Sequence, residues 1–299
     1  MSTLSRPALL LALLLILAAC SGAAAPSAPG GSASPPSGSP ATSEEPSTGA
    51  IDHATGATDV ILRYDEGPGL MMPSYVAIMA PYFTLYGDGT FVFRNPMLEQ
   101  PPAAGPVMTQ NPFRTGTLSE DQIQELLEFA LTEGGLATAK ARYENNMLTD
   151  AGTAVFTLRA GGLDKKVEIY ALGGETEGVP DAQARVAFKR LADRLANLDQ
   201  DGTFPTDTYT PTTYRVVLID TGGFAGDAPV AWPWPDLEPS DFKPNELQSF
   251  PNRVMTAEEL APLGVAGIEG GFQGVTLLGP SGDASYSLAV RPLLPDETS

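Results

Sequence analysis

Hydrophobic and polar positions alternate with a period of two in several short stretches of the chain. Residues 58–64 are the first of these, with Val60, Leu62 and Tyr64 on one face and Ile61 and Arg63 on the other. A period of two places alternate side chains on opposite faces of a pleated strand. The pattern therefore predicts a half-buried β-strand.

Two longer stretches have the pattern of β-hairpins. Aromatic and Leu side chains alternate on both sides of Gly87-Asp88-Gly89 over residues 83–93, and apolar residues alternate on both sides of Gly161-Gly162 over residues 154–171. Glycine-rich dipeptides between alternating runs are typical of tight turns. We expect an antiparallel hairpin at each place.

Two stretches have helical periodicity instead. Ser119 and Gln122 form the pattern of a capping box, and Leu118 and Ile123 occupy the two positions of a hydrophobic staple, so a helix is predicted to begin at Ser119. Gly134-Gly135 is predicted to end it. A second helix is predicted after Pro180-Asp181, where apolar residues recur at helical spacing: Ala184, Phe188, Leu191, Leu195 and Leu198.

The order hairpin, helix, hairpin, helix over residues 58–199 predicts an α+β fold. We expect an antiparallel sheet of four strands built from the β-hairpins, with the two main helices packed on one face. A smaller β-rich C-terminal part covers residues 210–295, with a strand at 214–219, a Pro/Trp-rich loop, a short helix capped by Thr256 and a hairpin over 275–290. Its strands either extend the first sheet or form a second small domain.

The first 20 residues have the features of an export signal. Arg6 precedes an apolar run from Ala8 to Leu17, and the small residues Ala18 and Ala19 precede Cys20. The run is shorter than the about 20 residues that a membrane-spanning helix needs. Leu17-Ala18-Ala19-Cys20 resembles the signal of bacterial lipoproteins. That resemblance implies a signal peptide at 1–19, acylation of Cys20, and anchoring to lipid on the extracytoplasmic side of the cell membrane or outer membrane.

Residues 20–57 consist mostly of Ser, Gly, Ala and Pro. Such a composition offers no apolar face to bury and predicts a disordered tether. A flexible chain of this length would hold the folded part roughly 30 to 35 Å from the lipid anchor.

Charge and residue counts exclude several classes of function. The formal net charge is −19, with 36 acidic and 17 basic residues, which argues against nucleic acid as a partner. Cys20 is the one cysteine and His53, within the expected tether, the one histidine. Ser-His-Asp triads, Cys-His dyads and zinc sites of His and Cys are therefore excluded. No cofactor, metal or catalytic residue is expected.

Two groups of oxygen ligands remain as candidates for chemistry. Asp65 and Glu66 are expected just after the first strand, where a pair of carboxylates could act as acid and base on a glycosidic bond, although neighbouring strand residues point in opposite directions. Asn197–Gly202 matches the first half of a calcium loop, but Pro205 and Thr208 depart from its second half. The plainer interpretations are solvated turn residues and a helix end.

Aromatic residues suggest a binding surface. Trp232 and Trp234 alternate with prolines and could present their rings to a sugar or a proline-rich peptide, or could pin the loop over the core. Tyr82, Thr84 and Tyr86 would extend this surface if the outer face of the first hairpin is uncovered. We leave the choice between these open.

The order of elements is similar to that of a family of uncharacterised exported bacterial domains. The matching residues are Tyr82–Arg94, Leu118–Leu127 and Thr153–Leu172, whereas Met71-Met72-Pro73 stands where members often carry cysteines. This resemblance implies a fold and no activity. We therefore expect a lipid-anchored, non-catalytic binding module of the cell envelope, with an envelope protein or wall glycan as partner. The alternatives are a carboxylate-only enzyme acting on polysaccharide and a weak calcium-binding structural protein.

Overall fold

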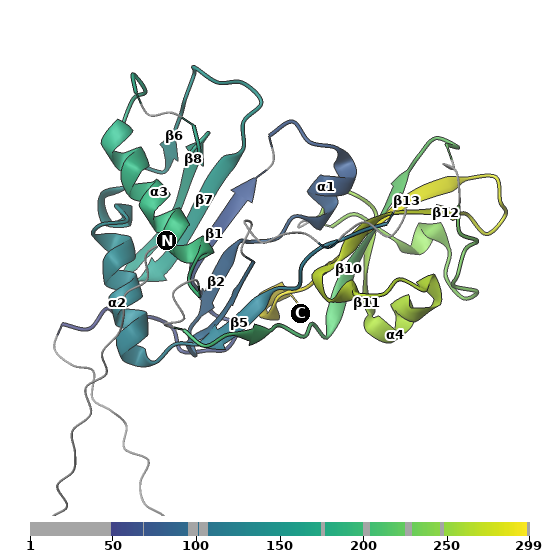
Figure 1. Ribbon diagram of the computed structural model, residues 1–299, viewed down its shortest axis with the longest axis horizontal. Helices are drawn as coiled ribbons and strands as arrows, with labels where there is room; N and C mark the ends of the chain where they lie inside the picture. Colours follow the sequence, from purple (N-terminus) through teal and green to yellow (C-terminus); the bar gives the residue numbers. More distant parts are fainter. Residues whose placement is uncertain are drawn as a thin grey trace, which may run out of the picture. The chain divides into compact units, whose positions relative to one another are not determined.

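The computed structural model describes residues 49–67, 69–94, 101, 107–174, 177–199, 204–224, 229–245 and 248–297. Cys20 and the expected signal peptide lie outside these residues. Ser47–Ser299 form one compact unit, and its described residues contain two sheets (Figure 1). The α+β fold predicted from the sequence is confirmed.

The first sheet has the described strand order β6-β8-β7-β1-β2-β3-β5-β9, so β1 lies between the two predicted hairpins. All its pairs are antiparallel except β6 with β8, and it is larger than the four strands expected. The strands are β1 (Val60–Gly67), β2 (Phe83–Tyr86), β3 (Thr90–Phe93), β5 (Arg114–Thr117), β6 (Arg142–Tyr143), β7 (Thr153–Ala160), β8 (Leu163–Tyr170) and β9 (Asp207–Thr208).

A β-bulge changes the expected faces at the start of β1. Val60 pairs with Tyr86 and Leu62 with Leu85, and the register shifts between the two pairs. Val60 therefore lies on the face opposite Leu62, and Ile61 joins the main core in its place. The extra residue of a bulge breaks the strict alternation on which the prediction rested.

Helices α2 (Glu120–Leu131) and α3 (Ala182–Ala196) pack on one face of the first sheet, as predicted. The capping box is present, because the backbone N–H of Ser119 donates to Gln122 Oε1 at 2.8 Å and that of Gln122 donates to Ser119 Oγ at 3.4 Å. The apolar stripes of both helices meet the alternating side chains of the hairpins. Their largest buried members are Phe83, Phe91, Phe93, Phe156 and Phe188.

The C-terminal strands form a second sheet of their own, in the described order β11-β10-β13-β12-β4. One face packs against helix α1 (Pro73–Ile78), and the other against the Trp-containing loop and α4 (Ala257–Leu260). The strands are β4 (Met108–Thr109), β10 (Thr213–Asp220), β11 (Asn252–Thr256), β12 (Phe272–Leu278) and β13 (Ser285–Pro292), and the 3-10 turns are η1 (Leu136–Thr138), η2 (Pro239–Asp241), η3 (Ala261–Leu263), η4 (Ile268–Gly270) and η5 (Pro295–Glu297).

The chain crosses between the sheets more than once. β4 and α1 precede the helices of the first sheet but belong to the second, whereas β9 follows them and joins the first. The expected boundary between 58–199 and 210–295 therefore does not separate the two sheets. No helix in the described ranges is long and apolar enough to cross a membrane.

The last residues of the expected tether pack against the folded part. The backbone N–H of Ile51 donates to Gln124 Oε1 at 2.7 Å, Gln124 Nε2 donates back to Ile51 O at 3.0 Å, and Gly161 N–H donates to Asp52 O at 2.7 Å. The tether was expected to reach residue 57, but the chain is already bonded to the folded part at Ile51 and Asp52. Composition alone missed this because the bonds use backbone groups.

Candidate functional site

His53 is held by the fold rather than lying in a linker. Its Nδ1 is 2.7 Å from Ala54 O and its Nε2 is 3.2 Å from Glu120 Oε1, and its side chain is 5% exposed. The residue also forms an isolated antiparallel bridge with Ala160. The interpretation of His53 as an unheld linker residue is wrong, because its Nε2 reaches Glu120 of α2 and its backbone forms a bridge with Ala160 of β7.

Asp65 and Glu66 lie within β1, not after it, and therefore point to opposite faces. Glu66 accepts a hydrogen bond from the Tyr64 hydroxyl at 3.1 Å. Burial raises the pKa of Asp65, and the opposing charges of Arg63 and Arg291 reduce that rise. The two carboxylates thus occupy separate surroundings, which does not suit a joint acid and base on one bond.

Asp199, the described acidic residue of the expected calcium loop, is engaged by protein groups. Its carboxylate accepts from Thr206 Oγ1 at 3.1 Å and lies 3.7 Å from Arg114 Nε. Residues 200–203 of that loop lie outside the described residues. Within the described ranges, no group of three or more His, Cys, Asp or Glu side chains is placed to hold a metal ion.

Trp232 and Trp234 pin their loop over the second core. The indole N–H of Trp232 donates to Leu237 O and that of Trp234 to Glu259 O, both at 2.7 Å. The two rings pack edge to face, with centroids 5.3 Å apart and planes at 82°, and Trp234 is buried. An open cavity of about 420 Å³ lies between this loop and the turn Leu278–Gly282. The rings do not form a flat stacking platform.

The outer face of the first hairpin is covered. Thr84 and Tyr86 are fully buried, and the Tyr86 hydroxyl donates to Asp296 Oδ1 at 2.7 Å. Burial, with a further contribution from Asp296, raises the pKa of Tyr86. The condition for an aromatic surface on this hairpin is therefore not met at Thr84 and Tyr86, because the C-terminal turn η5 covers them. The cavity beside Trp232 is not lined by Tyr82 or Asp65.

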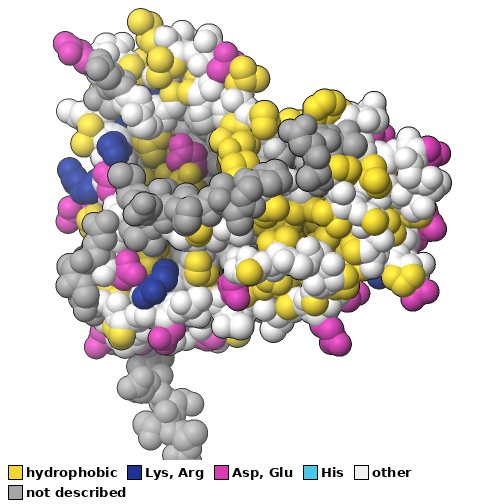
Figure 2. Space-filling model, turned by 45° about the vertical axis from the view of Figure 1, so that its right-hand side comes forward, with side chains coloured by type: hydrophobic (Ala, Val, Ile, Leu, Met, Phe, Trp, Pro, Cys, Tyr) yellow, Lys and Arg dark blue, Asp and Glu magenta, His cyan; other side chains and the backbone are white. Residues whose placement is uncertain are grey.

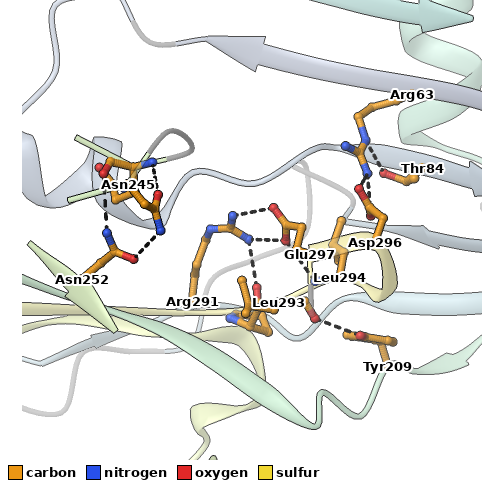
Figure 3. Close-up of polar contacts among 12 residues, drawn as sticks. Arg63, Thr84, Tyr209, Asn245, Asn252, Arg291, Leu293, Leu294, Asp296 and Glu297 are labelled. Carbon is orange, nitrogen blue, oxygen red and sulfur yellow. Dashed lines mark hydrogen bonds and ion pairs between the residues drawn. The ribbon is translucent and has the colours of Figure 1, made fainter. Parts of the chain in front are cut away.

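Turn η5 joins the two sheets through two ion pairs (Figure 3). Arg63 of the first sheet donates through Nη2 to both carboxylate oxygens of Asp296 at 2.8 Å, and Arg291 of the second sheet donates to Glu297 at 2.8 and 2.6 Å. Burial opposes ionisation of Glu297, but its bonds to Arg291 hold the pKa of its carboxyl below the ordinary value. Sequence reasoning missed this network, since its partners are more than 200 positions apart in the case of Arg63.

A second feature missed from the sequence is a surface of exposed Leu and Met side chains. Leu70, Met72 and Met147 are 84%, 61% and 78% exposed, and Met71 and Leu148 are also exposed. Their two loops are adjacent, because Leu70 N–H donates to Asp150 O at 3.2 Å. We call these five residues the Leu-Met surface. The run Leu70-Met71-Met72 before Pro73 is the signal that could have indicated it.

Polar and apolar side chains share the molecular surface unevenly. Figure 2 shows acidic side chains mostly around the edge of the visible face and hydrophobic ones gathered in several places on it.

Comparison of the chain with family models, curated proteins and solved structures finds no match. Its function is therefore argued from its own residues.

Proposed function

We propose that the protein is a lipoprotein anchored on the extracytoplasmic side of the cell envelope through acylated Cys20, and that its folded part binds another envelope protein without catalysing a reaction. The sequence Leu17-Ala18-Ala19-Cys20 supports the anchor. The Leu-Met surface is the observation that supports the binding role. Large apolar side chains gathered on two adjacent loops are typical of protein contact sites.

The chemistry of the Leu-Met surface favours a protein partner. Burying a Leu or Met side chain contributes about 1.5 to 3 kcal/mol, so a few such residues supply much of the free energy of a contact. The flexible Met side chains can also adjust to the shape of a partner. Leu70 and Met147 expose most of their surface to such a partner.

The anchor is tested by labelling cells with a fatty-acid analogue and measuring the mass of the mature chain. Label is expected on the wild-type protein and none on Cys20→Ser. An intact leader, or a mature chain with a free thiol, would disprove lipid anchoring.

The binding role is tested by photo-crosslinking in intact envelopes. The triple substitution of Leu70, Met72 and Met147 by Ser is expected to reduce a specific crosslinked partner at least about tenfold, which corresponds to 1.4 kcal/mol. Phe224→Ser is the matched control, because Phe224 is 77% exposed elsewhere on the fold. Both variants should keep the wild-type melting temperature. Equal crosslinking in both variants would contradict the assignment of the Leu-Met surface.

A further inference from the structure

The face of the second sheet that packs against α1 also carries several buried polar side chains. Strand register places Arg215 of β10 directly opposite Arg291 of β13, and Gln273 of β12 opposite Ala289, two residues before Arg291. Ala289 packs against α1, whereas the alternate residues of these strands pack against the Trp-containing loop. Arg215, Gln273 and Arg291 therefore share one face, and Thr213, two residues before Arg215, shares it too.

Arg94, which follows β3 of the first sheet, reaches the same place. Its Nη2 donates to Gly270 O at 2.6 Å, three residues before Gln273, and its guanidinium lies 3.9 Å from the centroid of the Phe113 ring. Burial, with a contribution from the charge of Arg291, lowers the pKa of Arg94 to about 10. The same two causes lower the pKa of Arg215. Arg94 and Arg215 thus both lie within electrostatic reach of Arg291.

Several polar side-chain atoms of this face have no hydrogen-bond partner in the part of the chain that the structure describes. Arg215 is 4% exposed and Gln273 is 1% exposed. Among the described residues, the buried side-chain atoms without a hydrogen-bond partner include Arg94 Nε, Arg215 Nε, Thr213 Oγ1 and both amide atoms of Gln273. Buried polar atoms in folded proteins nearly always have a partner. An amide with neither its donor nor its acceptor used is a strong departure from that rule.

The charges of the face are also unbalanced, because its three guanidiniums face two described carboxylates, Glu297 and Asp65, which lies within electrostatic reach of Arg291. Of its three arginines, Arg291 has the direct carboxylate partner Glu297. Arg94 donates to a backbone carbonyl. Burial and the repulsion from Arg291 lower the pKa of Arg215, and the charge of Glu297 reduces that lowering. Guanidinium groups bind oxyanions through parallel N–H donors. The excess of positive charge and of free donors is what an oxyanion would neutralise.

We propose that this arginine face, formed by Arg94, Thr213, Arg215, Gln273 and Arg291, binds a small oxyanion of the phosphate or carboxylate class. Arg94 and Arg215 supply the charge-assisted donors, and Thr213 and Gln273 supply a hydroxyl and an amide. The inference is independent of the lipid anchor and of the Leu-Met surface. It goes beyond protein binding by giving the fold a small-molecule ligand.

The test measures thermal unfolding of the purified mature protein in millimolar phosphate, acetate or malonate, each against chloride at equal ionic strength. A ligand at 100 times its dissociation constant is expected to raise the melting temperature by roughly 5 to 10 °C. A larger rise with phosphate than with the carboxylates would identify a tetrahedral oxyanion, and the reverse order a carboxylate.

Arg215→Met is the decisive variant, and Arg253→Met is its control. Arg253 lies on the same sheet, opposite Val216, on the face of the Trp-containing loop, and its Nε is also buried without a partner. Arg215→Met should fold, because it replaces a buried cation, whose Nε has no partner among the described residues, by an apolar side chain of similar volume and so removes the cost of desolvating the charge. It should lose the anion-dependent rise, whereas Arg253→Met should keep it.

Two outcomes would overturn the proposal. One is the absence of any anion-dependent rise in the wild-type protein, together with no saturable uptake of labelled phosphate or acetate in equilibrium dialysis. The other is an equal rise in wild type, Arg215→Met and Arg253→Met, which would indicate general exclusion of the salt from the protein surface.

Discussion

Replacing Asp296 by Asn should show how much the C-terminal turn contributes to stability. The Arg63 and Asp296 side chains are 20% and 17% exposed and are joined by two hydrogen bonds of 2.8 Å. Removing one partner of a buried ion pair costs about 3 to 5 kcal/mol, because the other charge is left unpaired. Some solvent reaches this pair, so we expect a loss of about 2 to 4 kcal/mol.

In a domain of this size each kcal/mol changes the melting temperature by about 2 to 4 °C, so Asp296→Asn should unfold roughly 5 to 15 °C below wild type. Circular dichroism during heating measures this, and denaturant titration gives the free energy. Asp164→Asn is the control, because Asp164 is 78% exposed in its pair with Arg159 and such pairs contribute less than about 1 kcal/mol. Adding Arg63→Met to Asp296→Asn should recover part of the loss. Equal stability of Asp296→Asn and Asp164→Asn would refute the reasoning.

Three further substitutions test other parts of the fold. The pKa of the Glu297 carboxyl is held below its ordinary value of 4.5. The contribution of Glu297 to the free energy of unfolding is therefore present above pH 4.5 and is lost as the pH falls through the pKa of the folded state. The difference in stability between wild type and Glu297→Gln, measured by denaturant titration, should narrow below pH 4.5. Trp234→Ala should cost about 3 to 5 kcal/mol in the same assay, because it empties a buried ring position and leaves the Glu259 carbonyl without its donor. Gly89→Ala should be clearly less stable to heat than Gly162→Ala: both glycines have positive φ (86° and 71°), but an added Cβ would lie 2.4 Å from Leu118 O only at Gly89. A Gly162→Ala variant that is equally or more destabilised would contradict this.

The local elements were predictable because each is encoded by neighbouring residues. Ser119 and Gln122 identify a helix start three residues apart, and the Gly87–Gly89 turn identifies a hairpin, so both were correct. The faces of these elements were less predictable. Thr84 and Tyr86 alternate with Phe83 and Leu85 in the way of a solvated outer face, yet they are buried by η5.

That failure has a general physical cause. Alternation tells which side of a strand is apolar enough for a core, but a polar side can be covered as well when its groups find partners. Arg63 and Tyr86 find theirs in Asp296, 233 and 210 positions away, and no local pattern encodes a contact at that separation. The arginine face was missed for the same reason, since Arg94 and Arg215 come from different sheets.

The C-terminal turn also bears on the proposed binding role, because it tests whether the Leu-Met surface is held together by the first sheet alone. The two loops of this surface continue from β1 and β7, which pair as far as Gly67 opposite Thr153, and Leu70 N–H donates to Asp150 O beyond that pair. Loosening the link between the sheets through Asp296 should therefore leave the two loops side by side while the first core is folded. We expect Asp296→Asn to keep full crosslinking to the envelope partner at temperatures at which its circular dichroism is still native, as Asp164→Asn should. Weaker crosslinking by Asp296→Asn than by Asp164→Asn below its melting temperature would show that the adjacency of the two loops depends on the turn.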